Sequence, residues 1–79
     1  MTQHLLAQCV RDSVESYFRD LDGTDPSHVH DMLMRAVEKP LLEVVMAKAD
    51  HNQSRAAAWL GLNRNTLRKK LLEHGLLDA

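Results

Sequence analysis

The chain has 79 residues, which suits one small domain and leaves no room for a second hydrophobic core. Hydrophobic residues make up 44% and charged residues 27%, with three glycines and two prolines, so the composition excludes a disordered tail or a flexible linker. No stretch approaches the roughly 18 apolar residues that cross a bilayer. The single cysteine, Cys9, permits no internal disulfide. We therefore expect a cytoplasmic protein with no membrane partner.

The formal net charge of −1 is the sum of two unlike halves. Residues 1–50 carry five basic and nine acidic side chains, for a net charge of −4. Residues 51–79 carry five basic and two acidic side chains, for a net charge of +3. A basic end of this kind is typical of a surface that faces a polyanion.

The first predicted element is an amphipathic helix from about Leu5 to Leu21, because apolar residues recur at intervals of four and three. We expect Asp22-Gly23 to end it, since glycine adopts the left-handed conformation without strain. Asp25 or Ser27 is then expected to cap the next helix.

The second predicted helix runs from about Val29 to Ala49 and is apolar nearly all round, with its charges in an arc of roughly 140°. One other long helix cannot cover such a surface, so we predict a homodimer whose long helices pack into an intertwined bundle. Pro40 removes the hydrogen bond to the Ala36 carbonyl. Continuous apolar spacing favours a kink there, and a break into two shorter helices is the alternative.

Residues 52–71 are typical of a helix-turn-helix. We expect Asn52 to cap a short helix whose small residues Ala56 and Ala57 allow another helix to cross closely. Gly61 is expected to turn the chain with a positive φ, and Asn63 to cap a final helix. Residues 1–50 are thus predicted to be a helical dimerisation region and residues 51–79 a DNA-binding region, within one all-α domain of four helices.

The final helix has two unlike faces. Leu67 and Leu71, four residues apart, are predicted to anchor it to the core, and Gly75 to close its end. The opposite face is polar and basic. A helix that enters the major groove N-terminus first uses such side chains, because arginine can bond two guanine acceptors at once. The members of this face and its flanks are Arg64, Asn65, Thr66, Arg68, Lys69 and Lys70.

Three segments of the sequence resemble the Fis family (factor for inversion stimulation) of bacterial nucleoid-associated proteins. They are Tyr17 to Gly23, Glu38 to Met46 and Asn52 to Lys70. The likeness runs without gaps from about Arg11 to Gly75 and is most specific over Leu62 to Leu71.

This resemblance implies an intertwined homodimer that inserts two recognition helices into adjacent major grooves of double-stranded DNA and bends it. It also implies largely indirect readout, with roles in nucleoid organisation and transcriptional regulation. Carried over by position, the base contacts would be Asn63, Arg64 and Lys69. The phosphate contacts would be Asn52, Ser54, Arg55, Thr66, Arg68 and Lys70.

Three departures from the family pattern qualify these expectations. Only a short leader precedes the first helix where longer members carry a β-hairpin arm, which argues against stimulating a DNA invertase. Asp50-His51 replaces an Arg-Gly pair, which argues against contact with RNA polymerase. Glu73 replaces a lysine that helps hold the DNA backbone, which predicts weaker binding or a flatter salt dependence.

Other readings of the sequence are a helical dimerisation or adaptor module without a nucleic-acid role, and a detached DNA-binding domain of a nitrogen-type response regulator. No enzyme is predicted, since the chain has no glycine-rich phosphate loop and no paired-carboxylate signature. No cofactor, catalytic residue or metal ligand is predicted either, because His28 and His30 are about 200° apart on a regular helix.

Overall fold

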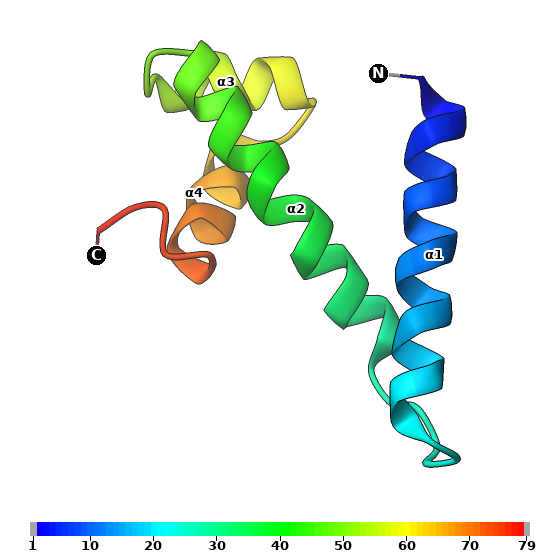
Figure 1. The fold of residues 1–79 in the computed structure, drawn as a ribbon. Coiled ribbons are helices and arrows are strands. Elements are labelled where there is room, and N and C mark those ends of the chain that lie inside the picture. Colours follow the sequence, from blue (N-terminus) through cyan, green and yellow to red (C-terminus); the bar gives the residue numbers. More distant parts are fainter. Residues whose placement is uncertain (1, 79) are drawn as a thin grey trace.

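A computed structural model describes residues 2–78 and places four α-helices and no strand in that range (Figure 1). The helices are α1 (Gln3–Leu21), α2 (Val29–Lys48), α3 (Gln53–Leu60) and α4 (Arg64–Glu73). The all-α prediction is confirmed, and the two long helices begin and end within two residues of their predicted limits. None of these helices is both long and apolar enough to span a membrane.

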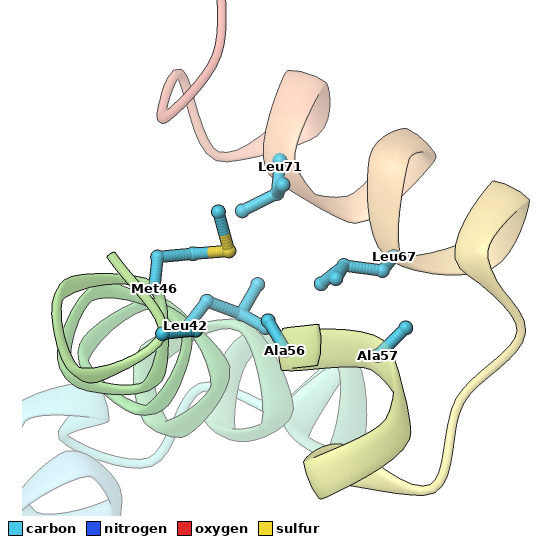
Figure 2. Close-up of a cluster of buried hydrophobic side chains, with 7 residues drawn as sticks. Leu42, Met46, Ala56, Ala57, Leu67 and Leu71 are labelled. Carbon is cyan, nitrogen blue, oxygen red and sulfur yellow. The ribbon is translucent and has the colours of Figure 1, made fainter. Parts of the chain in front are cut away.

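The buried core lies where α2, α3 and α4 meet (Figure 2). It is small and almost wholly aliphatic, and it spans the boundary at residue 50 between the acidic and basic halves. The predicted anchors Leu67 and Leu71 are buried, as are the small residues Ala56 and Ala57 that let α3 approach its neighbours closely. The buried side chains are Leu42, Met46, Ala49, Ala56, Ala57, Leu67 and Leu71.

Helix α1 lies outside this core. Figure 1 shows α1 and α2 as two arms that diverge from the turn joining them, and every side chain of α1 is exposed or half-buried. The radius of gyration is 15.1 Å, against about 12 Å for a compact chain of this length. The single chain therefore leaves much apolar surface on α1 and α2 in solvent. Its large exposed members there are Leu5, Leu6, Phe18, Met32, Met34, Val37, Leu41 and Val44.

The turn between α1 and α2 differs in part from the prediction. Gly23 is left-handed as expected, with φ of 88°, and Asp22 before it is left-handed as well. The capping prediction for Asp25 or Ser27 is wrong. His28 is the residue that precedes α2, with φ of 55° and no side-chain capping bond, so Asp25 and Ser27 lie outside the helix start.

Pro40 does not divide the second helix. Helix α2 is continuous from Val29 to Lys48 with Pro40 inside it, so the alternative of a break is wrong. The proline is exposed, and the carbonyl of Ala36, which loses its partner there, belongs to an exposed residue as well.

The last three helices end in the same hydrogen-bonded motif, in which a left-handed residue follows the helix and the next amide bonds back five residues. Gly61 and Gly75 supply the left-handed residue after α3 and α4, whereas Asp50, with φ of 55°, supplies it after α2. The closing bonds run from the His51 amide to the Met46 carbonyl at 2.9 Å, from Leu62 to Ala57 at 2.9 Å and from Leu76 to Leu71 at 2.8 Å.

Replacing Asp50 by glycine should stabilise the fold. A Cβ in the left-handed region costs about 1–2 kcal/mol for an ordinary residue and less for aspartate, and part of the gain is lost because glycine is freer in the unfolded chain. We expect Asp50→Gly to raise the free energy of unfolding by about 0.5 kcal/mol. Urea denaturation at fixed protein concentration measures it.

Asp50→Ala is the matched control, because it also removes the carboxylate but keeps the Cβ. We expect it to lower the free energy of unfolding. Equal effects of glycine and alanine would show that the carboxylate, and not the backbone conformation, decides the stability at this position.

Candidate nucleic-acid interface

The helix-turn-helix is built by two asparagine caps and one glycine turn. The side-chain oxygen of Asn52 accepts a hydrogen bond from the Arg55 amide at 3.0 Å, and that of Asn63 accepts one from the Asn65 amide at 2.8 Å. Gly61 turns the chain between α3 and α4 with φ of 74°. All three predictions are confirmed. Because each cap uses only the oxygen, the side-chain NH₂ of each asparagine keeps its donors.

The packing of α4 decides which of its faces is available. Leu67 and Leu71 point into the core, so at 100° per residue Lys69 lies directly opposite them, with Asn65 and Thr66 beside it. These three residues are exposed. The predicted polar face of the last helix is therefore turned to solvent along its length.

The predicted contact residues divide by exposure. Those assigned to bases, Asn63, Arg64 and Lys69, are all exposed, and Arg64 stands at the first position of α4. Of those assigned to phosphates, only Lys70 is not fully exposed. The exposed phosphate set comprises Asn52, Ser54 and Arg55 at the start of α3, with Thr66 and Arg68 on α4. Their roles remain predictions.

Lys70 forms an ion pair with α2. Its Nζ lies 2.9 Å from Oε2 of Glu38, and Nε2 of His74 lies 2.8 Å from Oε1 of the same carboxylate. The His74 side chain is only 6% exposed, whereas those of Lys70 and Glu38 are 31% and 27% exposed. One carboxylate of α2 thus holds the side chain of Lys70 on α4 and that of His74, the residue that directly follows α4.

The cluster makes Glu38 a stronger acid than an ordinary glutamate. The hydrogen bond from Lys70 and then that from His74 lower the pKa of Glu38, and partial burial opposes them. The fold therefore favours the ionised form of Glu38, and this negative charge helps to hold α4 against α2.

Sequence reasoning missed this cluster. In the sequence, Glu38 is one of the charged residues of the predicted second helix and Lys70 belongs to the predicted DNA-facing side, and nothing singles out His74. Lys70 and His74 are four residues apart, which puts them on one helix face. Their partner Glu38 lies 36 residues before His74 in sequence, and no spacing rule reaches across helix α3 and the two turns that flank it.

The structure places two of the three departures from the Fis pattern, the Asp50-His51 pair and Glu73. Asp50 and His51 are both left-handed, with φ of 55° and 61°, in the turn that leads into α3. Glu73 is exposed and lies one turn after Lys69 on α4, so it places a negative charge beside the basic face.

Comparison with known proteins identifies the family. A profile described as bacterial regulatory protein, Fis family, matches residues 33–74, which include most of α2 and all of α3 and α4. The chain belongs to the Fis family.

Relatives cover nearly its whole length. A Fis-like DNA-binding protein of Ralstonia nicotianae is 58% identical over 77 residues, which are 98% of this chain and 100% of that protein. One of Neisseria meningitidis serogroup B is 58% identical over 72 residues, 91% of each chain. The DNA-binding protein Fis of Yersinia enterocolitica is 42% identical over 76 residues, 96% of this chain and 78% of that protein.

The Glu38 cluster should make stability depend on acidic pH. A carboxyl group whose pKa is lower in the folded than in the unfolded chain stabilises the fold above its ordinary pKa of 4.5, and that contribution is lost as the pH falls through the lowered value. We expect Glu38→Gln to lower the melting temperature at about pH 7, by an amount that shrinks towards about pH 3. Thermal melts followed by circular dichroism measure both.

Glu43→Gln is the control, because Glu43 is an exposed carboxylate on the same helix that forms no ion pair within residues 2–78. Its melting curve should follow the wild type at each pH. A Glu38→Gln curve parallel to the wild type would show that the cluster contributes no proton-linked stability.

Proposed function

We propose that this protein is a homodimer that binds and bends double-stranded DNA, acting in nucleoid organisation and transcriptional regulation in the bacterial cytoplasm. The observation that carries the proposal is the exposed basic face of α4 on a capped helix-turn-helix, in a chain that matches Fis-like DNA-binding proteins over almost its whole length. A helical adaptor would gain nothing from Asn63, Arg64 and Lys69 at these positions.

Each predicted contact has a role that follows from its chemistry. Arg64, exposed at the start of α4, is the best candidate to bond a guanine, because a guanidinium matches the two acceptors on its major-groove edge. Asn63 and Lys69 are the other two proposed base contacts. The six phosphate contacts hold the helix in register without reading sequence. The first-turn amides of α3 and α4 add donors for phosphate oxygens.

The dimer is supported by apolar surface that one chain cannot cover. A groove along α2 is lined by apolar side chains of both arms, and Leu41 and Val44 in it are 48% and 57% exposed. Together with the other exposed apolar side chains of α1 and α2, this groove forms an apolar surface that is unusual on a soluble monomer. In the proposed assembly a second copy covers it, with residues 1–50 as the dimerisation region and residues 51–79 as the DNA-binding region. The groove is lined by Leu6, Ala36, Val37, Pro40, Leu41 and Val44.

The proposed specificity is largely indirect. Two recognition helices fixed on one rigid dimer favour DNA that deforms easily between their half-sites, because bending costs energy that depends on sequence. The negative charge of Glu73 beside Lys69 is expected to lessen the salt dependence relative to a lysine at that position.

Arg64 and Arg68 should affect DNA binding differently. At a site selected from random duplexes, we expect Arg64→Ala to cost about 1–3 kcal/mol, with little effect on unrelated duplexes. Arg68→Ala should weaken binding to all duplexes alike and reduce the salt slope by about one for each protomer. Gel shifts across a salt series measure both effects.

Duplexes with the site at the centre and at one end complete the test, because a bent complex migrates differently in the two. The proposal fails if the wild-type protein has no affinity for DNA at low salt. Equal migration of the two complexes would contradict DNA bending but not DNA binding.

The assembly should be dimeric at micromolar concentration. Leu41→Asp places a charge in the apolar groove and should shift the protein to monomers, because a buried unpaired carboxylate is costly. Lys39→Asp is the control, since it adds a carboxylate on the charged side of the same helix. Sedimentation equilibrium distinguishes the species, and a folded wild-type monomer at these concentrations would contradict the dimer.

A further inference from the structure

The carboxylate of Glu38 is shared by two basic side chains, one on each oxygen. Lys70 lies at 2.9 Å from Oε2 and His74 at 2.8 Å from Oε1. Lys70 belongs to α4 and His74 directly follows it, whereas Glu38 belongs to α2. His74 is the inner partner, with its side chain 6% exposed, and Lys70 is the outer partner at 31%. The ammonium that neutralises the carboxylate is therefore the one nearer to solvent and to the proposed DNA face.

In the part of the chain that the structure describes, the other charged residues near this cluster do not form ion pairs with the Glu38 carboxylate. On α2, Arg35 and Lys39 are close to Glu38 in sequence, but both are exposed and neither forms an ion pair within residues 2–78. On α4, Glu73 precedes His74 and is exposed, and it has no ion pair in that range either. The titratable group that faces His74 from α2 is Glu38, and Lys70 on α4 shares that carboxylate.

We propose that Glu38, His74 and Lys70 form a proton-linked switch that sets whether the Lys70 ammonium is held by α2 or released to a DNA phosphate. Neutral His74 gives Glu38 a hydrogen bond but no charge, so Lys70 is the counter-ion. Protonated His74 brings a positive charge to the same carboxylate from its buried side. Lys70, on a long flexible stem, is then exchanged to a phosphate at lower cost.

The inference rests on the proposed function, because it uses the assignment of Lys70 as a phosphate contact. It adds a direction that this assignment lacks: affinity for DNA rises when His74 gains a proton. An ion pair of surface strength corresponds to about 1.4- to 5-fold in an equilibrium constant, and we take this range for the partly exposed pair of Lys70 and Glu38. Two protomers give about 2- to 25-fold for the dimer.

The first experiment compares two histidine variants. Fluorescence anisotropy with a labelled duplex is measured at about pH 8 and pH 6 at constant ionic strength, for wild type, His74→Gln and His51→Gln. His51 is the control because it lies beside Asn52 at the start of α3 and is not a partner of Glu38, so it is a histidine near the proposed phosphate contacts that does not act through Lys70. We expect His51→Gln to retain most of the pH dependence and His74→Gln to lose most of it.

The second experiment uses Glu38→Gln, which removes the competing carboxylate and leaves His74 in place. We expect tighter DNA binding than wild type at about pH 8, a smaller pH dependence, and a salt slope that no longer changes with pH. In the wild type, the slope should steepen by about one for each protomer from pH 8 to pH 6. A purely structural role of Glu38 predicts the opposite sign, weaker binding on its loss.

Circular dichroism at the assay temperature confirms that each variant is folded, and Glu38→Gln alone decides the question if His74→Gln does not fold. Equal pH dependence in wild type and His74→Gln would overturn the switch, as would weaker binding by folded Glu38→Gln at pH 8. Absence of DNA binding by the wild type at both pH values and low salt would instead overturn the proposed function.

Discussion

The burial of Leu67 and Leu71 against α2 and α3 is the contact on which the rest of the molecule depends. Both side chains are almost completely inaccessible, and they fix the rotation of α4 about its own axis. That rotation turns Lys69 outward and brings Lys70 and His74 to α2. Aliphatic packing in the core thus decides which charges lie on the surface, because a helix that buries one face must expose the opposite face.

The two halves of the chain solve different physical problems. The basic end finds its core within one chain, since small residues let α3 approach closely and Leu42 and Met46 of α2 complete the packing. The acidic end has one amphipathic helix and one helix that is apolar nearly all round, and no residue of α1 is buried. The near-zero net charge therefore conceals a segregation of charge that matches a segregation of roles, one end proposed for assembly and the other for DNA.

Helix caps and turns were predicted correctly from the sequence where one residue decides the local structure. Asn52, Asn63 and Gly61 cap and turn the helices as predicted, because side-chain capping and positive φ depend on near neighbours. Prediction failed where several local solutions compete. Asp25 and Ser27 are good caps by residue type, yet α2 begins after His28, and Asp50 takes a left-handed position that glycine occupies elsewhere in the chain.

The sequence by itself determined the helical fold, the helix-turn-helix and the identity of the polar face of the last helix, because these follow from periodicity, capping and turn chemistry over a few residues. Only the tertiary structure decided that Glu38 meets Lys70 and His74. That contact depends on the angle at which α4 crosses α2, which is set by the packing of the whole core and is encoded in no single stretch of the chain.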